Sequence, residues 1–115
     1  MMATLKGYKG EEGMWKHLVD EPASGNETSR TAMYAYARIG GVKRGWLDAQ
    51  EYGTVARKGW IALTGYINAD DEIIDVCEGT NIKNDKDHYM NRKRIVGDLH
   101  AHAPLLWCAA ELISE

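Results

Sequence analysis

Phenylalanine is absent from the sequence, cysteine occurs only twice, and no apolar run is long. Because a membrane-spanning helix needs roughly 20 consecutive apolar residues, the sequence predicts no such helix. The opening Met1–Lys6 lacks the apolar core of a secretion signal, and the compartment stays open between cytoplasm and periplasm. Cys77 and Cys108 match no metal or redox spacing, so we interpret them as free thiols.

An excess of positive charge is also missing. The net charge is -3, and the lysines and arginines are scattered among acidic residues. Such a pattern provides no basic patch for nucleic acid and no polybasic segment for an anionic membrane. We therefore expect neither of these partners.

The composition is that of a single globular domain covering residues 1–115. Hydrophobic residues make up 44% and charged residues 27% of the chain, which is ordinary for a globular protein. The aromatic residues are four tryptophans and six tyrosines. Their rings combine an apolar body with a polar group, which suits a sugar-binding cleft but equally a packed core.

The first half of the chain predicts an extended segment and one helix. Residues 13–21 show no helical period, and a helix follows from about Glu27 to Ile39. Asn26 or another small polar residue is the expected N-cap, and Gly40–Gly41 is the expected end. The residues expected on the buried side of this helix are Ala32, Met33, Tyr36, Ala37 and Gly40.

A second helix has clearer boundaries. Asp48 followed by Glu51 is a capping-box pattern and predicts a helix that runs to about Tyr66. Residues 73–77 are β-prone, and we expect this short strand to pair with the extended residues 15–19. The predicted fold class is therefore mainly α, with a short pair of β-strands.

A long polar loop over residues 78–100 precedes the last helix. Pro104 is expected in the first turn of that helix, where a missing N–H has no cost. The helix is apolar on most sides, and such a helix needs neighbours on more than one face. Because the chain supplies few other helices, we expect a second copy to cover the open flank, in a homo-oligomer or helix-exchanged assembly.

Five groups of residues occur in an order that resembles the C-terminal third of glycoside hydrolase family 105, the unsaturated rhamnogalacturonyl hydrolases. The resemblance covers nearly the whole chain. Its motifs are Gly13-Met14-Trp15 with Asp20 and Pro22; Glu27-Thr28-Ser29 before Thr31-Ala32-Met33; Gly41-Val42 with Gly45-Trp46-Leu47; Val76-Cys77 with Gly79-Thr80; and Tyr89 and Arg92 before Gly97-Asp98-Leu99-His100 and Ala103-Pro104-Leu105-Leu106-Trp107.

The resemblance implies that these residues belong to an (α/α)6 barrel, as two to three of its helical hairpins. It also implies a chemistry: an aspartate protonates C4 of a terminal unsaturated uronate, water adds at C5, and the neighbouring sugar is released. Unlike the paired carboxylates of ordinary glycosidases, one carboxyl group can act as acid and then base. The family's catalytic aspartate and histidine precede the matching region, so we predict no activity for this chain alone.

Candidate substrate-binding residues follow from the same motifs, and each has a structural alternative. Trp15 would stack on a sugar ring, or else pack in the core. Glu27 and Ser29 would bind sugar at a helix start, or else only cap the helix. Thr80 would line the cleft, or else serve a turn.

The other candidates lie near the last helix. Arg92 would clamp the uronate carboxylate beside Tyr89, or else be a solvated loop residue. His100, oriented by Asp98, would contact the substrate, or else hold the loop. Asp98-Leu99-His100-Ala101-His102 also resembles the first metal motif of amidohydrolases, but further ligands are missing from the sequence, and we expect no metal and no cofactor.

The family resemblance leaves two function hypotheses. The first is the C-terminal part of an unsaturated rhamnogalacturonyl or glucuronyl hydrolase acting on pectin-derived oligosaccharides. The alternative is a non-catalytic helical module that binds carbohydrate or another partner. Two departures from the family pattern, Gly25 and Ala101-His102, bear on the substrate contacts.

Overall fold

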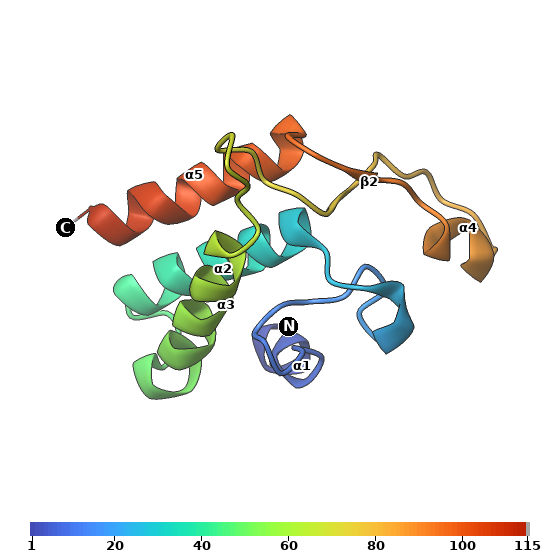
Figure 1. The fold of residues 1–115 in the computed structure, drawn as a ribbon. Helices are drawn as coiled ribbons and strands as arrows, with labels where there is room; N and C mark the ends of the chain where they lie inside the picture. The colour runs from blue at the N-terminus through green and yellow to red at the C-terminus, as the bar shows by residue number, and fades with distance from the viewer. Residues whose placement is uncertain (115) are drawn as a thin grey trace.

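The computed structural model describes residues 1–114, which form a mainly helical fold with one small antiparallel sheet, as predicted (Figure 1). No helix in this range is long and apolar enough to cross a membrane. The elements are α1 (Met2–Gly7), the 3₁₀ turn η1 (Pro22–Ser24), α2 (Thr28–Lys43), the π-helical turn η2 (Ala49–Gly53), α3 (Thr54–Thr64), β1 (Val76–Cys77), α4 (Lys86–Met90), β2 (Arg94–Ile95) and α5 (Leu99–Ile113).

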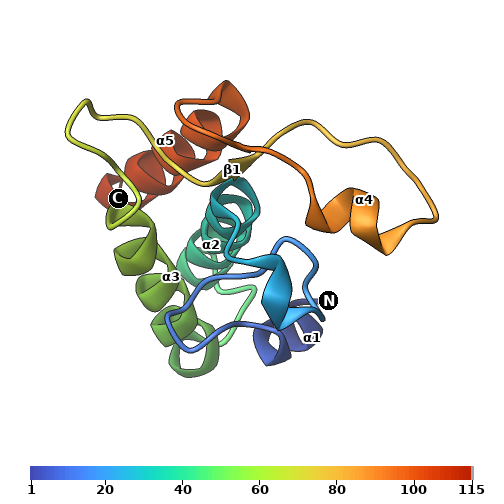
Figure 2. The same cartoon turned by 45° about the vertical axis from the view of Figure 1, so that its right-hand side comes forward.

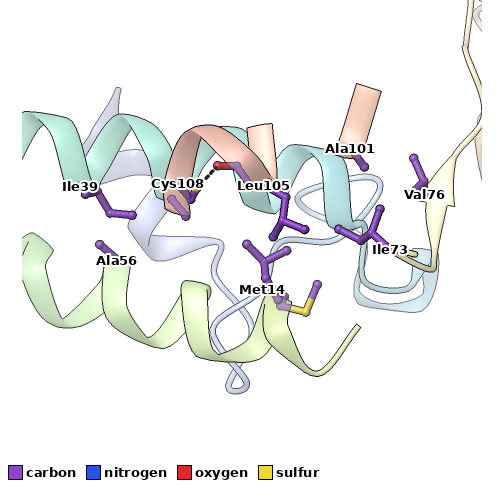
Figure 3. Packing of buried hydrophobic residues seen from close by; sticks show 11 residues of the cluster. Met14, Ile39, Ala56, Ile73, Val76, Ala101, Leu105 and Cys108 are labelled. Carbon is purple, nitrogen blue, oxygen red and sulfur yellow. Dashed lines mark hydrogen bonds between the residues drawn. The ribbon is translucent and has the colours of Figure 1, made fainter. Parts of the chain in front are cut away.

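Helix α2 lies at the centre of the fold, with α3 on one side and α5 on the other (Figures 1 and 2). Its small side chains permit this close packing, since Ala32 and Ala35 are buried against the neighbouring helices. The Cys108 thiol of α5 donates a hydrogen bond to the Ala32 carbonyl oxygen at 3.2 Å (Figure 3). The core cluster comprises Met14, Ala32, Ala35, Ile39, Ala56, Leu63, Ile73, Val76, Ala101, Leu105 and Cys108.

The buried side of α2 differs from the predicted stripe. Met33 is 44% exposed and Ala37 is exposed as well, so these two predictions were wrong. Periodicity failed here because polar side chains occupy much of the buried face and are satisfied by internal hydrogen bonds. The buried residues of α2 are Thr28, Ser29, Thr31, Ala32, Ala35, Arg38, Ile39, Gly40 and Gly41.

Both ends of α2 also differ from expectation. Glu27, rather than Asn26, is the N-cap. The helix passes through Gly40–Gly41 to Lys43, and Gly45, with φ of 75°, ends it. The amide of Gly45 bonds to the Val42 carbonyl and the amide of Trp46 to the Gly41 carbonyl, which is a Schellman motif.

The second predicted helix is confirmed with a change in its first turn. Asp48 caps it, since its Oδ1 accepts a hydrogen bond from the Gln50 amide at 3.1 Å. The first five residues form the π-helical turn η2, and regular α-helix runs only to Thr64. The end is therefore two residues earlier than the predicted Tyr66, as expected for a frayed terminus.

The predicted strand pairing was wrong. Val76 and Cys77 pair with Ile95 and Arg94, in antiparallel register, rather than with residues 15–19. The extended N-terminal segment instead forms a bridge between Lys16 and Asn26, just before α2. Strands of two residues carry no alternating pattern, so the sequence did not distinguish the possible partners.

The polar loop is shorter and more ordered than predicted. It contains the single turn α4 and the strand β2, and α5 begins at Leu99, where Asp98 caps it. Pro104 consequently lies in the second turn of α5 rather than in its first turn. There it removes one backbone hydrogen bond of the helix, and its fully buried ring is packed in the interior.

Candidate functional site

A cavity of about 530 Å³ opens between the N-terminal end of α2, the segment after β1, and the turn α4. Its walls combine charged, hydroxyl and aromatic side chains, which is typical of a site for a polar ligand. The lining residues are His17, Leu18, Glu27, Ser29, Arg30, Met33, Tyr34, Cys77, Glu78, Gly79, Thr80, Asn81, Ile82, Tyr89 and His100.

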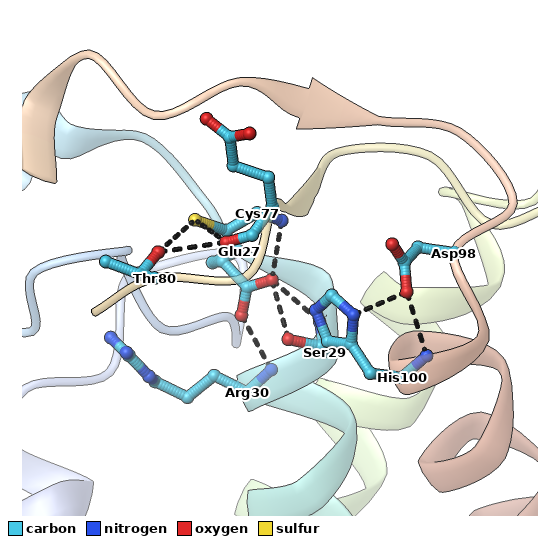
Figure 4. Close-up of polar contacts among 8 residues, drawn as sticks. Glu27, Ser29, Arg30, Cys77, Thr80, Asp98 and His100 are labelled. Atoms are coloured by element: carbon cyan, nitrogen blue, oxygen red, sulfur yellow. Dashed lines mark hydrogen bonds and ion pairs between the residues drawn. The ribbon is translucent and has the colours of Figure 1, made fainter.

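The Glu27 carboxylate joins the two main walls of this cavity (Figure 4). One oxygen, Oε1, accepts hydrogen bonds from the Ser29 amide at 3.1 Å and the Ser29 hydroxyl at 2.8 Å. The same oxygen accepts one from the Cys77 amide of β1 at 3.1 Å. Oε2 accepts one from the Arg30 amide at 2.7 Å. The carboxylate therefore caps α2 and fastens β1 to it.

Arg30 supplies the cationic group of the cavity, and His17 supplies one of its two imidazoles. The Arg30 guanidinium donates to the backbone carbonyl of Lys16 at 3.1 Å and also to that of His17. His17 is only 7% exposed. Burial lowers its pKa, and the charges of Arg30 and Arg94 lower the pKa further, against weaker opposite effects of Glu27 and the Tyr89 carbonyl. His17 is therefore neutral at neutral pH.

Cys77 lies against His17, with 3.7 Å between Sγ and Nε2. Burial is the main cause that raises the pKa of the Cys77 thiol, so it is protonated at neutral pH. A protonated thiol is a poor nucleophile. The pair is therefore a hydrogen-bonding contact and not a thiolate–imidazolium pair.

The segment after β1 is held by its own polar contacts. Thr80 lines the cavity while its hydroxyl donates to the Glu78 carbonyl at 2.9 Å. The hydroxyl of Tyr89 accepts a hydrogen bond from the Lys83 amide at 2.8 Å. Arg92 does not line the cavity: its guanidinium donates to the Gly79 carbonyl, and its Nε lies 3.4 Å from a Glu78 carboxylate oxygen. Arg92 thus stabilises the segment after β1 without lining the cavity.

Asp98 and His100 contact each other at the start of α5. Asp98 Oδ1 accepts a hydrogen bond from the His100 amide at 3.1 Å and lies 2.5 Å from His100 Nδ1. His100 lines the cavity, whereas Asp98 does not. The backbone amide of His100, more than its side chain, lowers the pKa of the Asp98 carboxyl. The carboxylate thus caps α5 and orients the imidazole.

This lowered pKa predicts a pH-dependent stability. A carboxyl whose pKa is lower in the folded state stabilises the fold above its unfolded pKa of about 4 and loses that effect as the pH falls through the folded value. We expect Asp98→Ala to lower the melting temperature at neutral pH. At a pH low enough to protonate the Asp98 carboxyl in both the folded and the unfolded state, the variant and the wild type should have the same melting temperature. Asp98→Asn keeps a capping side chain without a charge and serves as the control. A wild-type–Ala difference that is the same at every pH would contradict this assignment.

Trp15 is placed in the interior rather than in the cavity. It is 0% exposed, its indole N–H donates to the Leu5 carbonyl at 2.7 Å, and the Arg38 guanidinium lies 4.6 Å from its ring centroid. The Tyr34 ring meets it edge-on at 5.3 Å. A ring enclosed in this way has no free face for a sugar, so the predicted stacking role of Trp15 is not available in this structure.

The structure brings together most of the predicted candidates and adds others that sequence reasoning missed. Glu27, Ser29, Thr80, Tyr89 and His100 line one cavity, as a shared site requires. The additional residues are His17, Arg30 and Cys77. Arg30 adjoins a predicted site residue in sequence, and Cys77 lies within a family-like motif, but a histidine in an aperiodic segment gave no signal.

The histidines do not converge on a metal site. In residues 1–114 no group of three or more His, Cys, Asp and Glu side chains is placed to bind a metal ion. His102 Nε2 is already engaged by the fold, since it accepts a hydrogen bond from the Ile73 amide at 3.3 Å.

Comparison with known proteins gives a consistent family. A sequence model of Glycosyl Hydrolase Family 88 matches residues 1–115. Among solved structures, possible GH105 family members from Klebsiella pneumoniae and Salmonella enterica are each 27% identical, with TM-scores of 0.89 and 0.90. A family 88 glycosyl hydrolase from Bacteroides vulgatus is 24% identical, with a TM-score of 0.77, a likeness of fold.

These matches cover different shares of the two chains. They include 96% of this chain but only 29% of the Klebsiella and Salmonella chains, and 97% of this chain but 32% of the Bacteroides chain. The residues therefore correspond to about a third of a helical-barrel enzyme, as the sequence motifs predicted. On its family match over residues 1–115 and its structural neighbours, the chain belongs to the glycoside hydrolases of the family 88 and family 105 group.

Proposed function

We propose that this chain forms one wall of the sugar site of an unsaturated rhamnogalacturonyl or glucuronyl hydrolase, which hydrates the 4,5-double bond of a terminal unsaturated uronate in pectin-derived oligosaccharides. The supporting observation is the cavity itself, in which side chains from three separate family-like motifs meet. Its hydroxyl, imidazole and guanidinium groups offer the hydrogen bonds that a uronyl sugar needs. The proposed substrate is an unsaturated uronyl oligosaccharide.

The cavity offers no free carboxyl group as the proton donor for this reaction. Two carboxylates line it, and both are engaged by the fold. Glu27 accepts four hydrogen bonds from backbone and hydroxyl donors. Glu78 accepts one from the Lys93 amide and lies beside Arg92. A general acid must present a free proton to the substrate, so we assign this role to a residue outside the chain.

A chimera tests the proposal. This chain would replace the structurally equivalent segment of the Klebsiella relative, and the loss of enol-ether absorbance of unsaturated galacturonyl-rhamnose would be followed. We expect turnover by the chimera and none by the chain alone. A chimera that is folded by circular dichroism but inactive, while the parent relative is active on this substrate, would contradict the proposal. Turnover by the chain alone would contradict the absence of a proton donor.

A non-catalytic carbohydrate-binding module is the second candidate. It is favoured by the same feature, a cavity with groups for binding and with both carboxylates occupied by the fold. An in-frame upstream region that encodes an aspartate-bearing helical segment would favour the enzyme, and a genuine start codon at Met1 would favour the module.

We also propose that copies of this chain associate through the outer face of α5 and the adjoining surface of α2. Large apolar side chains are exposed there, including Leu106 at 65%, Trp107 at 52% and Ile113 at 86%. With Met33, Tyr36 and Trp46, Trp107 lines a groove of about 410 Å³. A symmetric pair of copies would cover the same apolar face on both partners, which is how most homodimers bury such a surface.

Light scattering with size-exclusion chromatography checks this association. We expect a mass of at least twice 12.9 kDa, and a shift to the monomer in Leu106→Glu, because a buried unpaired charge weakens an apolar interface. Ile82→Glu, at a residue that is 97% exposed on the loop, is the matched control and should leave the mass unchanged. A monomeric wild type would contradict the proposal.

A further inference from the structure

Arg30 places a positive charge in the cavity wall that the fold leaves without a counter-ion. It is the one lysine or arginine among the described residues that line the cavity, and within residues 1–114 no carboxylate forms an ion pair with it. The two carboxylates of the wall have other partners: Glu27 accepts hydrogen bonds from three backbone amides and one hydroxyl, and Glu78 lies beside Arg92. Because a guanidinium stays protonated in proteins, the charge of Arg30 is permanent. Such a charge in a cavity wall points to an anionic ligand group.

One side of the Arg30 guanidinium is held by the backbone, and the other side is open. The side chain extends from the start of α2, away from His100 (Figure 4). Its Nη1 donates to the Lys16 carbonyl at 3.1 Å and to the His17 carbonyl, whereas Nε and Nη2 donate to no group in the described part of the chain. Both of these nitrogens are accessible to solvent, since the buried side-chain atoms that lack a partner belong to other residues. Nε and Nη2 form the edge of a guanidinium whose parallel N–H bonds match the two oxygens of a carboxylate.

The charges around Arg30 favour an anion at this end of the cavity. After burial, the main cause, the charges of Arg30 and Arg94 lower the pKa of His17, so both guanidinium groups act on the same imidazole. Glu27 opposes them with a smaller effect. Nη2 of Arg94 already donates to the Ser24 carbonyl at 2.6 Å. Arg94 therefore adds positive potential, while Arg30 provides the open edge.

Resting on the proposed function, we infer that the Nε and Nη2 edge of Arg30 binds the carboxylate of the uronyl sugar, and that Arg30 is the residue by which the site prefers an acidic sugar to a neutral one. Arg92, the arginine that the sequence predicted for this role, is occupied by Gly79 and Glu78. A neutral sugar presents hydroxyl or ester oxygens without charge, and its hydrogen bonds to the same edge are weaker. The fixed guanidinium adds to the preference, because little side-chain freedom is lost when the carboxylate binds.

Two ligands that differ only in charge test the inference on the full chain. Unsaturated galacturonyl-rhamnose and its uronate methyl ester would be titrated into ¹⁵N-labelled protein, and the shifts of the cavity amides would give both dissociation constants. We expect the acid to bind about tenfold more tightly than the ester, because hydrogen bonds to an ionised group are roughly twice as strong as neutral ones. Equal binding of the acid and the ester would overturn the inference and leave the proposed function intact. If neither ligand shifts any cavity amide, the inference and the proposed function fall together.

Two variants and a matched control assign the preference to Arg30. Arg30→Met should bind the acid and the ester equally, whereas Arg30→Lys keeps the charge without the paired N–H groups and should prefer the acid only about threefold. Arg57→Met removes an exposed arginine of α3 outside the cavity lining and should keep the wild-type ratio of the two dissociation constants.

This ratio separates ligand binding from a structural role. If Arg30 only holds the Lys16 and His17 carbonyls, Arg30→Met weakens both ligands alike and keeps the ratio, which would overturn the inference. If Arg30→Met does not fold, Arg30→Lys decides: a preference equal to that of the wild type would overturn the inference as well.

Discussion

Replacing Glu27 with alanine is expected to lower the free energy of unfolding by about 3 kcal/mol. The carboxylate is 2% exposed and accepts hydrogen bonds from the amides of Ser29, Arg30 and Cys77 and from the Ser29 hydroxyl. Loss of an N-cap costs typically about 1 kcal/mol, and each buried donor left without a partner adds to that cost. Urea unfolding followed by circular dichroism measures the change.

Glu27→Gln is the matched variant, because it keeps the shape of the side chain and one acceptor oxygen. Its amide NH₂ group faces donors in place of the second oxygen, so we expect an intermediate loss of stability. A Glu27→Ala protein as stable as the wild type would show that the carboxylate does not join α2 to β1. The consequence for the site is direct, because the same contacts hold two walls of the cavity in place.

Gly13→Ala is expected to have a similarly large effect, about 3 kcal/mol, from backbone strain and overpacking together. Gly13 adopts φ of 95°, which non-glycine residues rarely adopt. A methyl group there would lie 2.7 Å from Lys58 Cγ and 2.9 Å from the Lys58 carbonyl carbon. The second contact is with the backbone of α3, which cannot turn aside as a flexible side chain can. The N-terminal segment would have to move away from α3.

Two other glycines separate the causes. Gly45→Ala introduces the strain of a positive φ of 75° with no atom within 4 Å of the new methyl group, and should cost about 1–2 kcal/mol. Gly79→Ala has neither a positive φ nor a near neighbour and should change stability by less than about 0.5 kcal/mol. Equal losses of stability in Gly13→Ala and Gly45→Ala would mean that the N-terminal segment does not pack tightly against α3 at Gly13.

The sequence predicted those parts of the fold that depend on local signals. The Asp48 cap and the helical period after it identified α3, because both are properties of consecutive residues. Helix α2 was predicted as well, although its buried side was not. The end of α2 was misplaced because Gly41 is needed for packing against Leu47, where a methyl group would lie 2.7 Å from Cδ1, and not for a turn. A glycine pair inside a helix and one at its end look alike in sequence.

Local sequence signals did not predict which segments pair when they lie far apart in the chain. Strand β1 pairs with β2 through two residues on each strand, and Arg94–Ile95 lies in a polar segment without alternation. The family resemblance brought together Glu27, Ser29, Thr80, Tyr89 and His100, which do share one cavity. It did not reveal that Arg92 faces Glu78 and Gly79, since the direction of a side chain depends on the packed loop.

Trp15 and His17 show the same limit within one short segment. They are two residues apart on an extended stretch, yet Trp15 packs under Arg38 in the interior while His17 reaches the cavity. The alternative interpretations of Trp15, stacking on a sugar or packing in the core, differ only in what covers the ring. The Leu5 carbonyl of α1 accepts a hydrogen bond from the indole N–H of Trp15, and no sequence pattern links those two residues.

One titration tests the central claim most directly, that these residues form a sugar-binding wall without the proton donor. Unsaturated galacturonyl-rhamnose would be added to the ¹⁵N-labelled chain, with amide spectra and enol-ether absorbance recorded on the same samples. We predict saturable shifts at Ser29, Thr80 and His100, with constant absorbance. Shifts absent from all three positions would contradict the binding site, and a loss of absorbance would contradict the assignment of the proton donor to a residue outside the chain.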